Sequence, residues 1–384
     1  MKFLHIGDLH IGKSLSDFSL IEDQKFILDS IIDIAENKKA DGIFIAGDVY
    51  DRAIPSEEAV RLFDYFLRNL SAKQIMTFII SGNHDSDERL NFGSSFFEAN
   101  NVFICSKFNG KLYKKVLNDK DKKINVYLLP FVKASQVKHY YPDAKIENYE
   151  DAVRTIILNE DINQDETNIL VAHQFVAGKG SDTLLSGSES FAVQSVGLVE
   201  QIGTSCFDCF DYVALGHIHA PQQLGRPTLR YSGSPLKYSL NEVNNDKSVP
   251  LISTENGNIT VELIPLKPKR DLRHIKGKME QLLDKENIKD PDDFIYVTLT
   301  NEDFINDAIG IFRQVYPNVV RIDYDNAHTK EIEDIDITQI GKNRTFDELI
   351  SDFYRMIYNC DITPEELAIM KDVAKEAGVV NETD

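Results

Sequence analysis

Five short segments of this 384-residue sequence carry side chains that could hold metal ions. Each segment begins where a run of apolar residues ends, and together they contain five of the nine histidines. The segments are Asp8-Leu9-His10, Gly47-Asp48-Val49-Tyr50-Asp51-Arg52, Gly82-Asn83-His84-Asp85, His173, and Gly216-His217-Ile218-His219. Carboxylate and imidazole groups are ligands for borderline cations such as Mn²⁺, Fe²⁺ or Zn²⁺. The residue types therefore favour a metal site.

The spacing within the segments supports the same interpretation. In an extended chain, residues two apart face the same side, so Asp8 and His10 can act together, as can His217 and His219. The neighbouring glycines, among them Gly7, allow tight turns and close backbone approach. Two divalent ions about 3.5–4 Å apart can activate a water molecule and clamp a phosphoryl oxygen. We therefore expect two-metal phosphoryl chemistry.

Each segment taken alone has an ordinary explanation. An isolated Asp-x-His is usually a surface loop, and Gly-Asn-His-Asp is a typical turn sequence. A single histidine after an apolar strand, such as His173, is more often a core residue than a ligand. Five such segments, each at the end of an apolar run, are difficult to obtain by chance, and this favours the site over the separate explanations.

The apolar runs predict an α/β fold. Strands are expected over residues 2–6, 42–46, 76–80, 102–105, 125–129, 168–172 and 212–215, with helices over 20–35 and 56–70. Continuous apolar strands that alternate with helices indicate sheets buried on both faces. In such folds ligands bind at the carboxyl ends of the strands. The five segments lie at those ends.

The rest of the chain predicts two further parts. After residue 225 the pattern is rich in β-structure, with strands expected over 228–232, 249–254 and 258–265. We expect a catalytic domain over 1–266, a small αβ domain over 267–328, and a connector with a helical tail over 329–384. Within these, strands are predicted over 273–276, 294–299 and 319–324, and helices over 279–286, 301–315, 346–358 and 364–377. The basic stretch from Lys267 to Lys278 could contact DNA phosphates or be a solvated linker, with equal weight.

Composition excludes several classes of protein. With 42% hydrophobic and 27% charged residues the chain can bury a core, which excludes extensive disorder. It contains no apolar run near the ~20 residues of a membrane span. The start of the sequence does not resemble a signal peptide, and four cysteines do not make a disulfide framework, so a cytoplasmic location is expected. Cys206-x-x-Cys209 has redox or zinc spacing, but Phe207 and Phe210 favour packed, structural cysteines.

The net charge of −20 is unevenly distributed. Residues 271–384 carry 13 basic and 26 acidic side chains, about two-thirds of the excess acid. Metal ions would offset part of the remainder. The chain lacks the overall basic character of a stand-alone DNA-binding protein, yet its charge does not exclude DNA.

The order of the five segments resembles the signature of the calcineurin-like metallophosphoesterase superfamily. Within it the chain is similar to the branch of SbcD-type nucleases. That likeness rests on residues 7–12, residues 47–52, and Ser232-Gly233-Ser234-Pro235-Leu236 with Tyr238 and Glu242 nearby. The resemblance covers nearly the whole chain. It implies a β-sandwich flanked by helices, a small αβ capping domain and a C-terminal helical tail.

The resemblance also implies a role for each site residue. One metal ion would be held by Asp8, His10 and His219. The other would be held by Asn83, His173 and His217, with Asp48 bridging the pair. His84 would contact the scissile phosphate and assist the leaving oxygen instead of binding metal. The residues expected to orient the ligands are Asp51, Arg52 and Asp85.

The implied function is a Mn²⁺-dependent DNA phosphodiesterase of the nuclease class. It would act as a 3′→5′ exonuclease on duplex DNA and as an endonuclease on single strands and hairpins, in DNA repair, recombination and replication. ATP dependence would come through an SbcC-type coiled-coil ATPase partner. The alternative is a metallophosphoesterase acting on a small-molecule phosphodiester or a phosphoprotein. A non-catalytic scaffold would have lost metal ligands, and all are present here.

Two apolar surfaces suggest interfaces. The predicted helix over 56–70 and the nearby Phe92, Phe96 and Phe97 are expected to form a homodimer contact within a heterotetramer. The two tail helices have apolar residues at helical spacing, more than two short helices can bury on each other. We expect them to bind the ATPase partner, with docking on the chain's own catalytic domain as the alternative.

Overall fold

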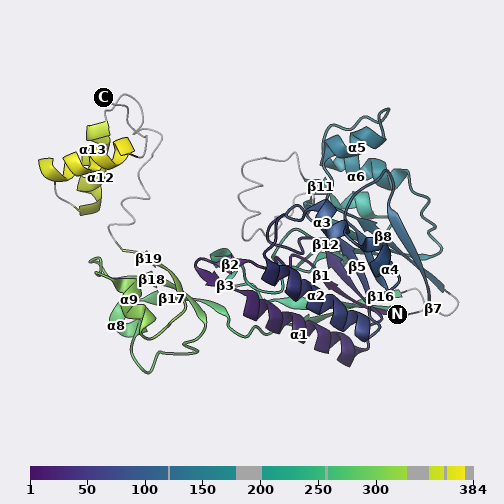
Figure 1. The fold of residues 1–384 in the computed structure, drawn as a ribbon, viewed down its shortest axis with the longest axis horizontal. Helices are drawn as coiled ribbons and strands as arrows, with labels where there is room; N and C mark the ends of the chain where they lie inside the picture. Colours follow the sequence, from purple (N-terminus) through teal and green to yellow (C-terminus); the bar gives the residue numbers. More distant parts are fainter. Residues whose placement is uncertain (120–121, 179–200, 256–257, 327–345, 359–360, 377–384) are drawn as a thin grey trace. The chain divides into compact units, whose positions relative to one another are not determined.

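The computed structural model describes residues 1–119, 122–178, 201–255, 258–326, 346–358 and 361–376 (Figure 1). The chain divides into two compact units, Met1–Arg273 and His274–Asp384. The domain boundary expected at residue 267 stays a prediction, and the start of the connector expected from residue 329 lies outside the described residues. Among the described residues, no helix is long and apolar enough to cross a membrane.

The described residues of the first unit form two six-stranded sheets. The first has the order β16-β15-β1-β4-β5-β6, with β1 (Lys2–Ile6), β4 (Gly42–Ala46), β5 (Met76–Ile80), β6 (Val102–Cys105), β15 (Ser248–Glu255) and β16 (Asn258–Pro265). The second has the order β13-β14-β12-β9-β8-β7, with β7 (Tyr113–Asp119), β8 (Lys122–Leu129), β9 (Thr167–His173), β12 (Tyr212–Gly216), β13 (Gln222–Leu224) and β14 (Arg226–Tyr231).

The strands that precede the site are parallel within each sheet. In the first sheet β1, β4, β5 and β6 run in the same direction, with Phe3 opposite Gly42 in the β1–β4 register. In the second sheet β8, β9, β12 and β14 do the same, and Gly216 stands opposite His173. The carboxyl ends of neighbouring strands therefore meet at one edge of each sheet.

The two sheets pack face to face through an apolar core. Phe3, Phe44 and Phe78 of the first sheet lie in one cluster with Val126, Val171 and Tyr212 of the second. The rings of Phe3 and Phe44 stack with centroids 4.9 Å apart. Burial on both faces explains why these strands read as continuous apolar runs. The expected sandwich is confirmed.

Helices cover the outer faces of the sandwich (Figure 1). α1 (Ile21–Lys38) and α2 (Glu57–Ala72) lie over the first sheet, and the Ser56 side chain caps α2 by accepting from the Ala59 N–H. α5 (Ala134–Tyr140) and α6 (Tyr149–Leu158) share an apolar cluster with the second sheet. Shorter elements are β2 (Ser14–Leu15), β3 (Phe18–Ser19), α3 (Asp87–Asn91), α4 (Ser94–Glu98), β10 (Val176–Ala177), β11 (Ile202–Gly203), η2 (Thr204–Phe207) and η3 (Leu240–Glu242).

The described part of the second unit contains a three-stranded sheet and two pairs of helices. The sheet has the order β17-β18-β19, formed by β17 (Leu272–Gly277), β18 (Phe294–Leu299) and β19 (Val319–Tyr324). α8 (Met279–Leu282) and α9 (Ala308–Arg313) share its apolar core. α12 (Phe346–Tyr358) and α13 (Pro364–Glu376) form the tail, where Thr363 and Glu366 cap α13 reciprocally.

Several predicted extents are wrong. The helix predicted over 279–286 ends at Leu282, and the one over 301–315 begins only at Ala308. Asp307 has a left-handed backbone (φ 50°), and its carboxylate accepts from the Gly310 N–H, so it starts the helix as a cap. β7, α5 and α6 were not predicted. β7 is an edge strand whose exposed positions include Lys114 and Asn118, which hides the apolar pattern.

Candidate metal centre

All the residues predicted to bind metal lie at one edge of the sandwich. Asp8 follows β1, Asp48 follows β4, Asn83 follows β5, His173 ends β9, and His217 and His219 follow β12. Several hydrogen bonds join the sheets there, and two of them involve the strand ends directly. Asp8 Oδ1 accepts from the His217 backbone N–H at 2.8 Å, and His173 Nδ1 donates to the Ala46 carbonyl oxygen at 2.8 Å. Side chains from both sheets are therefore held together.

Three groups among the described residues offer ligand atoms within 4.8 Å of one another. They are Asp8 with His10 and His219, Asp8 with Asp48 and His173, and His10 with Asp48 and His84. Asn83 extends the second group, because its Oδ1 lies 3.1 Å from His173 Nε2 and 3.0 Å from His217 Nδ1. The arrangement offers two adjacent sets of donors.

Asp48 lies between the two sets. Its Oδ2 is 3.6 Å from His10 Nε2 and 3.4 Å from His173 Nε2, so one carboxylate oxygen faces one ring of each set. Its Oδ1 accepts from the His84 backbone N–H at 2.9 Å. This is the position that a bridging carboxylate needs.

The donor atoms fit cations better than they fit one another. His10 Nε2 and His219 Nε2 face each other at 3.1 Å. Asp8 Oδ2 and His10 Nδ1 are buried and form no hydrogen bond with any described residue. A buried polar atom without a partner costs free energy, and a cation coordinated by Asp8 Oδ2 and by the two facing Nε2 atoms would remove that cost for the carboxylate. The residues present therefore fit a pair of metal ions.

Burial and neighbouring charges shift the pKa values of these groups in opposite directions. Burial raises the pKa of Asp8 to about 6 and lowers that of His217 to about 3. Burial by itself would raise the pKa of Asp48, but His173, His10 and His84 hold it well below its ordinary value. Asp48 in turn outweighs burial at His173 and raises the pKa of that ring to about 9. Metal binding needs deprotonated ligands, so it releases protons here and strengthens as pH rises.

The backbone bends sharply at these strand ends. Asp8 (φ 52°), His10 (φ 42°), Asp48 (φ 48°) and His217 (φ 102°) all have positive φ, which is rare for residues other than glycine. A Cβ on Gly216 would lie 1.8 Å from the Ala46 carbonyl oxygen, and one on Gly82 would lie 2.1 Å from Asp48 Oδ1. Glycine is required at both positions for the loops to approach each other.

Three residues were predicted to orient the ligands. Asp85 accepts from the backbone N–H groups of Val49, Tyr50 and Gly82 at 2.9–3.1 Å, which ties the loop after β4 to the loop after β5. Asp51 Oδ1 pairs with Lys13 at 2.7 Å and lies 3.6 Å from His10 Nδ1. The Arg52 side chain is 84% exposed, with its Nε 3.6 Å from Asp51. Asp85 and Asp51 thus contact the site, whereas Arg52 faces solvent.

His84 lies beside the donor sets with one ring nitrogen engaged. Its Nδ1 is 3.1 Å from the Asp51 carbonyl oxygen. A carbonyl only accepts, so Nδ1 donates, and Nε2 is the nitrogen left to exchange a proton with a bound molecule. Its ring centroid is 4.8 Å from that of His10.

The sequence reasoning missed the residues that support the site from other elements. Gln24 of α1 accepts from the Gly12 N–H and donates to the His10 carbonyl oxygen. Tyr238 donates to the Leu9 carbonyl oxygen, and Glu242 contacts His219. Tyr238 and Glu242 stood out only through family likeness. The sequence did not point to Gln24, because its role depends on contacts with residues that no local spacing pattern reveals.

The paired cysteines lie elsewhere. Cys206 is buried in the apolar cluster on the outer face of the second sheet, with Phe207 and Phe210. Cys206 and Cys209 are free thiols, and burial raises the pKa of Cys206 to about 11. This environment agrees with a packing role.

Comparison with known proteins yields two family matches. The model of the calcineurin-like phosphoesterases matches residues 1–221. A second model, SbcD_C, described as the type 5 capsule protein repressor C-terminal domain, matches residues 268–357.

Two solved structures are among those similar to the chain. The protein TT1561 of Thermus thermophilus is 12% identical, with a TM-score of 0.38, over 68% of this chain and 98% of that one. A dimetal phosphatase from Danio rerio is 12% identical, with a TM-score of 0.40, over 68% of this chain and 95% of that one.

Replacing the central carboxylate should disable the site. Asp48→Asn removes the charged group that faces both donor sets, so we expect bound Mn²⁺ to fall and turnover of bis-p-nitrophenyl phosphate to drop more than ~100-fold. Loss of a residue that only orients a ligand already lowers metal affinity or activity by about 10–100-fold. Asp29→Asn, whose carboxylate pairs with Lys25 on the surface of α1, is the control. Metal analysis that finds two ions still bound in an active Asp48→Asn protein would contradict the assignment.

His84 should behave differently from the metal-binding residues. If its Nε2 exchanges a proton with the reacting phosphate, His84→Ala keeps both ions while the turnover rate falls about 10²–10⁴-fold. Metal content measured beside the rate separates the two roles. Loss of an ion in this variant would make His84 a ligand instead.

Proposed function

Because the chain belongs to the calcineurin-like phosphoesterase family, we propose that it is a two-metal phosphodiesterase that cleaves DNA. The observation that carries the choice of DNA is the SbcD_C match over residues 268–357, which follows the phosphoesterase match in the same chain. The proposed activities are Mn²⁺-dependent 3′→5′ exonuclease action on duplex DNA and endonuclease action on single strands and hairpins. Their proposed place is DNA repair, recombination and replication.

The proposed ligand sets follow the geometry of the edge. Asp8, His10 and His219 hold one ion, and Asn83, His173 and His217 hold the other, with Asp48 between them. The support for this division is that Asp8, His10 and His219 form one close group, and that Asn83 Oδ1 lies near both His173 and His217. Asp48 Oδ2 faces one ring of each set. Asp8 also lies close to His173, so the two sets adjoin.

The chain's own residues position and protonate the substrate. Two divalent ions in these sets would supply Lewis acidity toward the phosphoryl oxygens and lower the pKa of a water molecule. His84 donates its Nδ1–H to the Asp51 carbonyl oxygen, which fixes the ring. When the ring carries a proton on each nitrogen, Nε2 gives its proton to the leaving 3′-oxygen, and the ring becomes neutral. Asp85 and Gly82 hold the loop that carries Asn83 and His84 in place throughout.

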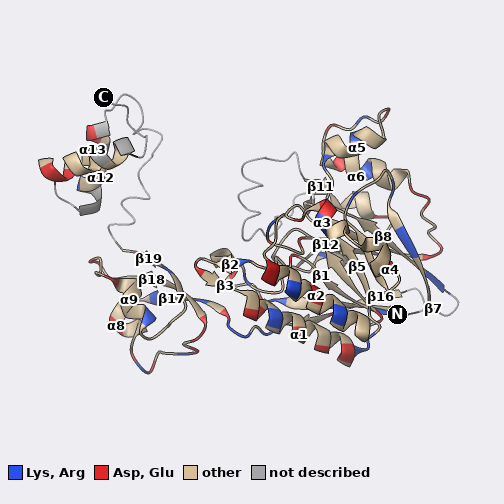
Figure 2. Cartoon of the chain, in the orientation of Figure 1, with Lys and Arg blue, Asp and Glu red and all other residues tan. Residues whose placement is uncertain are grey.

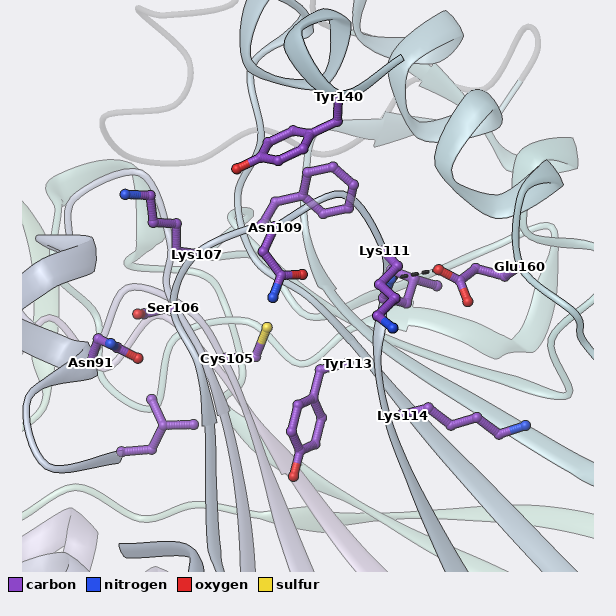
Figure 3. Close-up of a pocket in the computed structure, with 13 residues that line it drawn as sticks. Asn91, Cys105, Ser106, Lys107, Asn109, Lys111, Tyr113, Lys114, Tyr140 and Glu160 are labelled. Atoms are coloured by element: carbon purple, nitrogen blue, oxygen red, sulfur yellow. Dashed lines mark hydrogen bonds between the residues drawn. The ribbon is translucent and has the colours of Figure 1, made fainter. Parts of the chain in front are cut away.

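The alternative, a small-molecule phosphodiester or a phosphoprotein substrate, would use the same residues. A feature that favours a longer polyanion is a basic cavity of about 670 Å³ (Figure 3). Its lining includes Lys107, Lys111 and Lys114, which outnumber the one acidic residue there, Glu160. The lysines of β7 are visible as blue segments in Figure 2.

This cavity lies on the same edge of the sandwich as the metal centre. β6 is parallel to β5, so Lys107 follows β6 at the edge where Asn83 follows β5. Tyr113, the first residue of β7, pairs with Leu128 near the carboxyl end of β8, which is parallel to β9. A DNA strand with one phosphate at the metal centre could place further phosphates against these lysines, whereas a small phosphodiester could not.

The test compares two substrates with and without the cavity lysines. We expect the wild-type protein with Mn²⁺ to degrade plasmid DNA and to hydrolyse bis-p-nitrophenyl phosphate. Lys111→Ala with Lys114→Ala should weaken DNA binding and reduce its salt slope by about 0.9 per lost phosphate contact. Hydrolysis of the small substrate should not change.

Lys25→Ala with Lys38→Ala, two lysines of α1 that pair with Asp29 and Glu262, is the matched control and should leave both reactions unchanged. A wild-type protein that hydrolyses the small substrate but leaves plasmid DNA intact would favour the alternative substrates.

The proposed homodimer contact involves fewer residues than the sequence suggested. The apolar residues of α2 that prompted it are mostly buried, namely Leu62, Phe63, Phe66, Leu67 and Leu70. Phe92 and Phe96 remain 85% and 74% exposed, next to the loop that carries Asn83 and His84. These two aromatic side chains are the observation that supports a dimer through α3 and α4 (Figure 1).

The proposed partner is an SbcC-type coiled-coil ATPase that binds the tail. The support is the SbcD_C match, which extends into α12, and the apolar side chains that the tail helices leave exposed. Those side chains are Phe353, Ile369, Met370 and Val373. An amphipathic helix pair of this kind suits a helical groove on another chain.

Removing the tail should separate partner binding from catalysis. A protein truncated after Asn343, a position outside the described residues, should stay folded, because the sandwich and the three-stranded sheet have apolar clusters made of described residues that precede residue 327. It should keep basal Mn²⁺-dependent phosphodiesterase activity and lose the ATPase in a pull-down. Full-strength binding by the truncated protein, or its unfolding, would show that the tail serves another purpose.

A further inference from the structure

A buried ion pair lies directly behind His219. Glu242, at the end of η3, is 0% exposed, and its Oε2 is 2.6 Å from the Nζ of the nearly buried Lys247. Both residues follow residue 221, where the match to the phosphoesterase model ends. Burying two charges is costly unless their remaining hydrogen bonds are satisfied, so the other partners of this pair decide what it does.

The pair holds His219 at two points. Glu242 Oε1 is 3.1 Å from His219 Nδ1, and Lys247 Nζ donates to the His219 carbonyl oxygen at 2.9 Å. Lys247 also donates to Ser234 Oγ at 2.8 Å. The ammonium group of Lys247 thus joins Glu242, His219 and Ser234, and it fixes both the backbone of His219 and the carboxylate that contacts its ring.

This contact sets which ring nitrogen of His219 faces the metal centre. A carboxylate only accepts, so His219 Nδ1 carries a proton, and Nε2 is the nitrogen that can offer a lone pair to an ion. Nε2 lies 3.1 Å from His10 Nε2, in the donor set that includes Asp8. The ring is thereby held with Nε2 toward the site, as a metal ligand requires.

The segment of residues 232–236 packs against the His219 backbone and places Ser234 beside Lys247. Gly233 has φ +72°, and a Cβ there would lie 2.6 Å from the His219 carbonyl oxygen. The Ser234 backbone N–H donates to that same oxygen at 3.2 Å. The turn therefore packs against the loop after β12, and a side chain at position 233 would push it away.

We infer that Glu242 and Lys247 are positioning residues, which act through His219 to set the affinity for the ion that Asp8, His10 and His219 hold. This inference rests on the proposed metal ligands and is independent of the choice of DNA as substrate. The competing explanation is that the pair only stabilises the fold, in which case its loss affects folding but has no specific link to His219.

Metal titration by calorimetry on the full-length protein distinguishes these explanations. Glu242→Gln should weaken the affinity for one Mn²⁺ ion by about 10–100-fold and leave the other ion unchanged. In a His219→Ala background, the same substitution should have no further effect, because the residue through which Glu242 acts is gone. A purely structural role predicts equal effects in both backgrounds.

A matched pair of lysine variants controls for the loss of a buried charge. Lys247→Met should weaken the same ion, whereas Lys237→Met should not, although Lys237 also pairs with a carboxylate, Asp271, at 2.9 Å. If Glu242→Gln and Lys247→Met do not fold, Ser234→Ala removes one contact of Lys247 and should give a smaller, few-fold loss at the same ion.

Three results would overturn the inference. They are unchanged Mn²⁺ affinity in Glu242→Gln, an equal loss in the His219→Ala background, and equal effects of Lys237→Met and Lys247→Met. None of these depends on which phosphodiester is cleaved, so the proposed function can stand while this inference fails. Conversely, a wild-type protein that does not cleave DNA would leave the titration result intact.

Discussion

The site depends on the close approach of two parallel strand edges, one from each sheet. The two hydrogen bonds from Asp8 to the loop after β12 and from His173 to the end of β4 hold the edges together. Gly216 permits that approach, because any Cβ there would collide with the Ala46 carbonyl oxygen. Each sheet alone supplies only part of each donor set. The left-handed turns at Asp8, His10, Asp48 and His217 are the local consequence of ending strands so abruptly.

The opposing pKa shifts follow from the same packing. Carboxylates and rings that are removed from water can keep their charges only where they meet opposite charges, as Asp48 and His173 do. Asp8, with less compensation, has a pKa raised by burial. The sandwich thus concentrates donors in a place where a cation is the most effective partner. At a greater distance, Lys247 neutralises Glu242 within the support of His219, so that carboxylate can orient a ligand without adding an unpaired buried charge.

The sequence predicted the elements that are apolar throughout and the side chains at their ends. β1, β4, β5 and β6 have the expected bounds, because strands buried on both faces leave an unbroken apolar run. β7 and α5 escaped prediction since exposed polar residues interrupt their patterns. α6 has buried apolar residues at helical spacing, among them Val153 and Ile157, and its pattern was overlooked. α9 begins later than predicted, because Asp307 caps it and the helix does not extend toward the N-terminus. Gln24 and Lys247 act through contacts with residues far away in the sequence, and no spacing reveals these.

The central claim is that seven side chains from two sheets hold two ions around Asp48. Anomalous diffraction from a crystal grown with Mn²⁺ tests it most directly, because the peaks locate the ions independently of any activity. The account predicts two peaks about 3.5–4 Å apart, on either side of the Asp48 carboxylate. One peak should lie against Asp8, His10 and His219, and the other against Asn83, His173 and His217. A single peak, or two peaks that do not share Asp48, would contradict it.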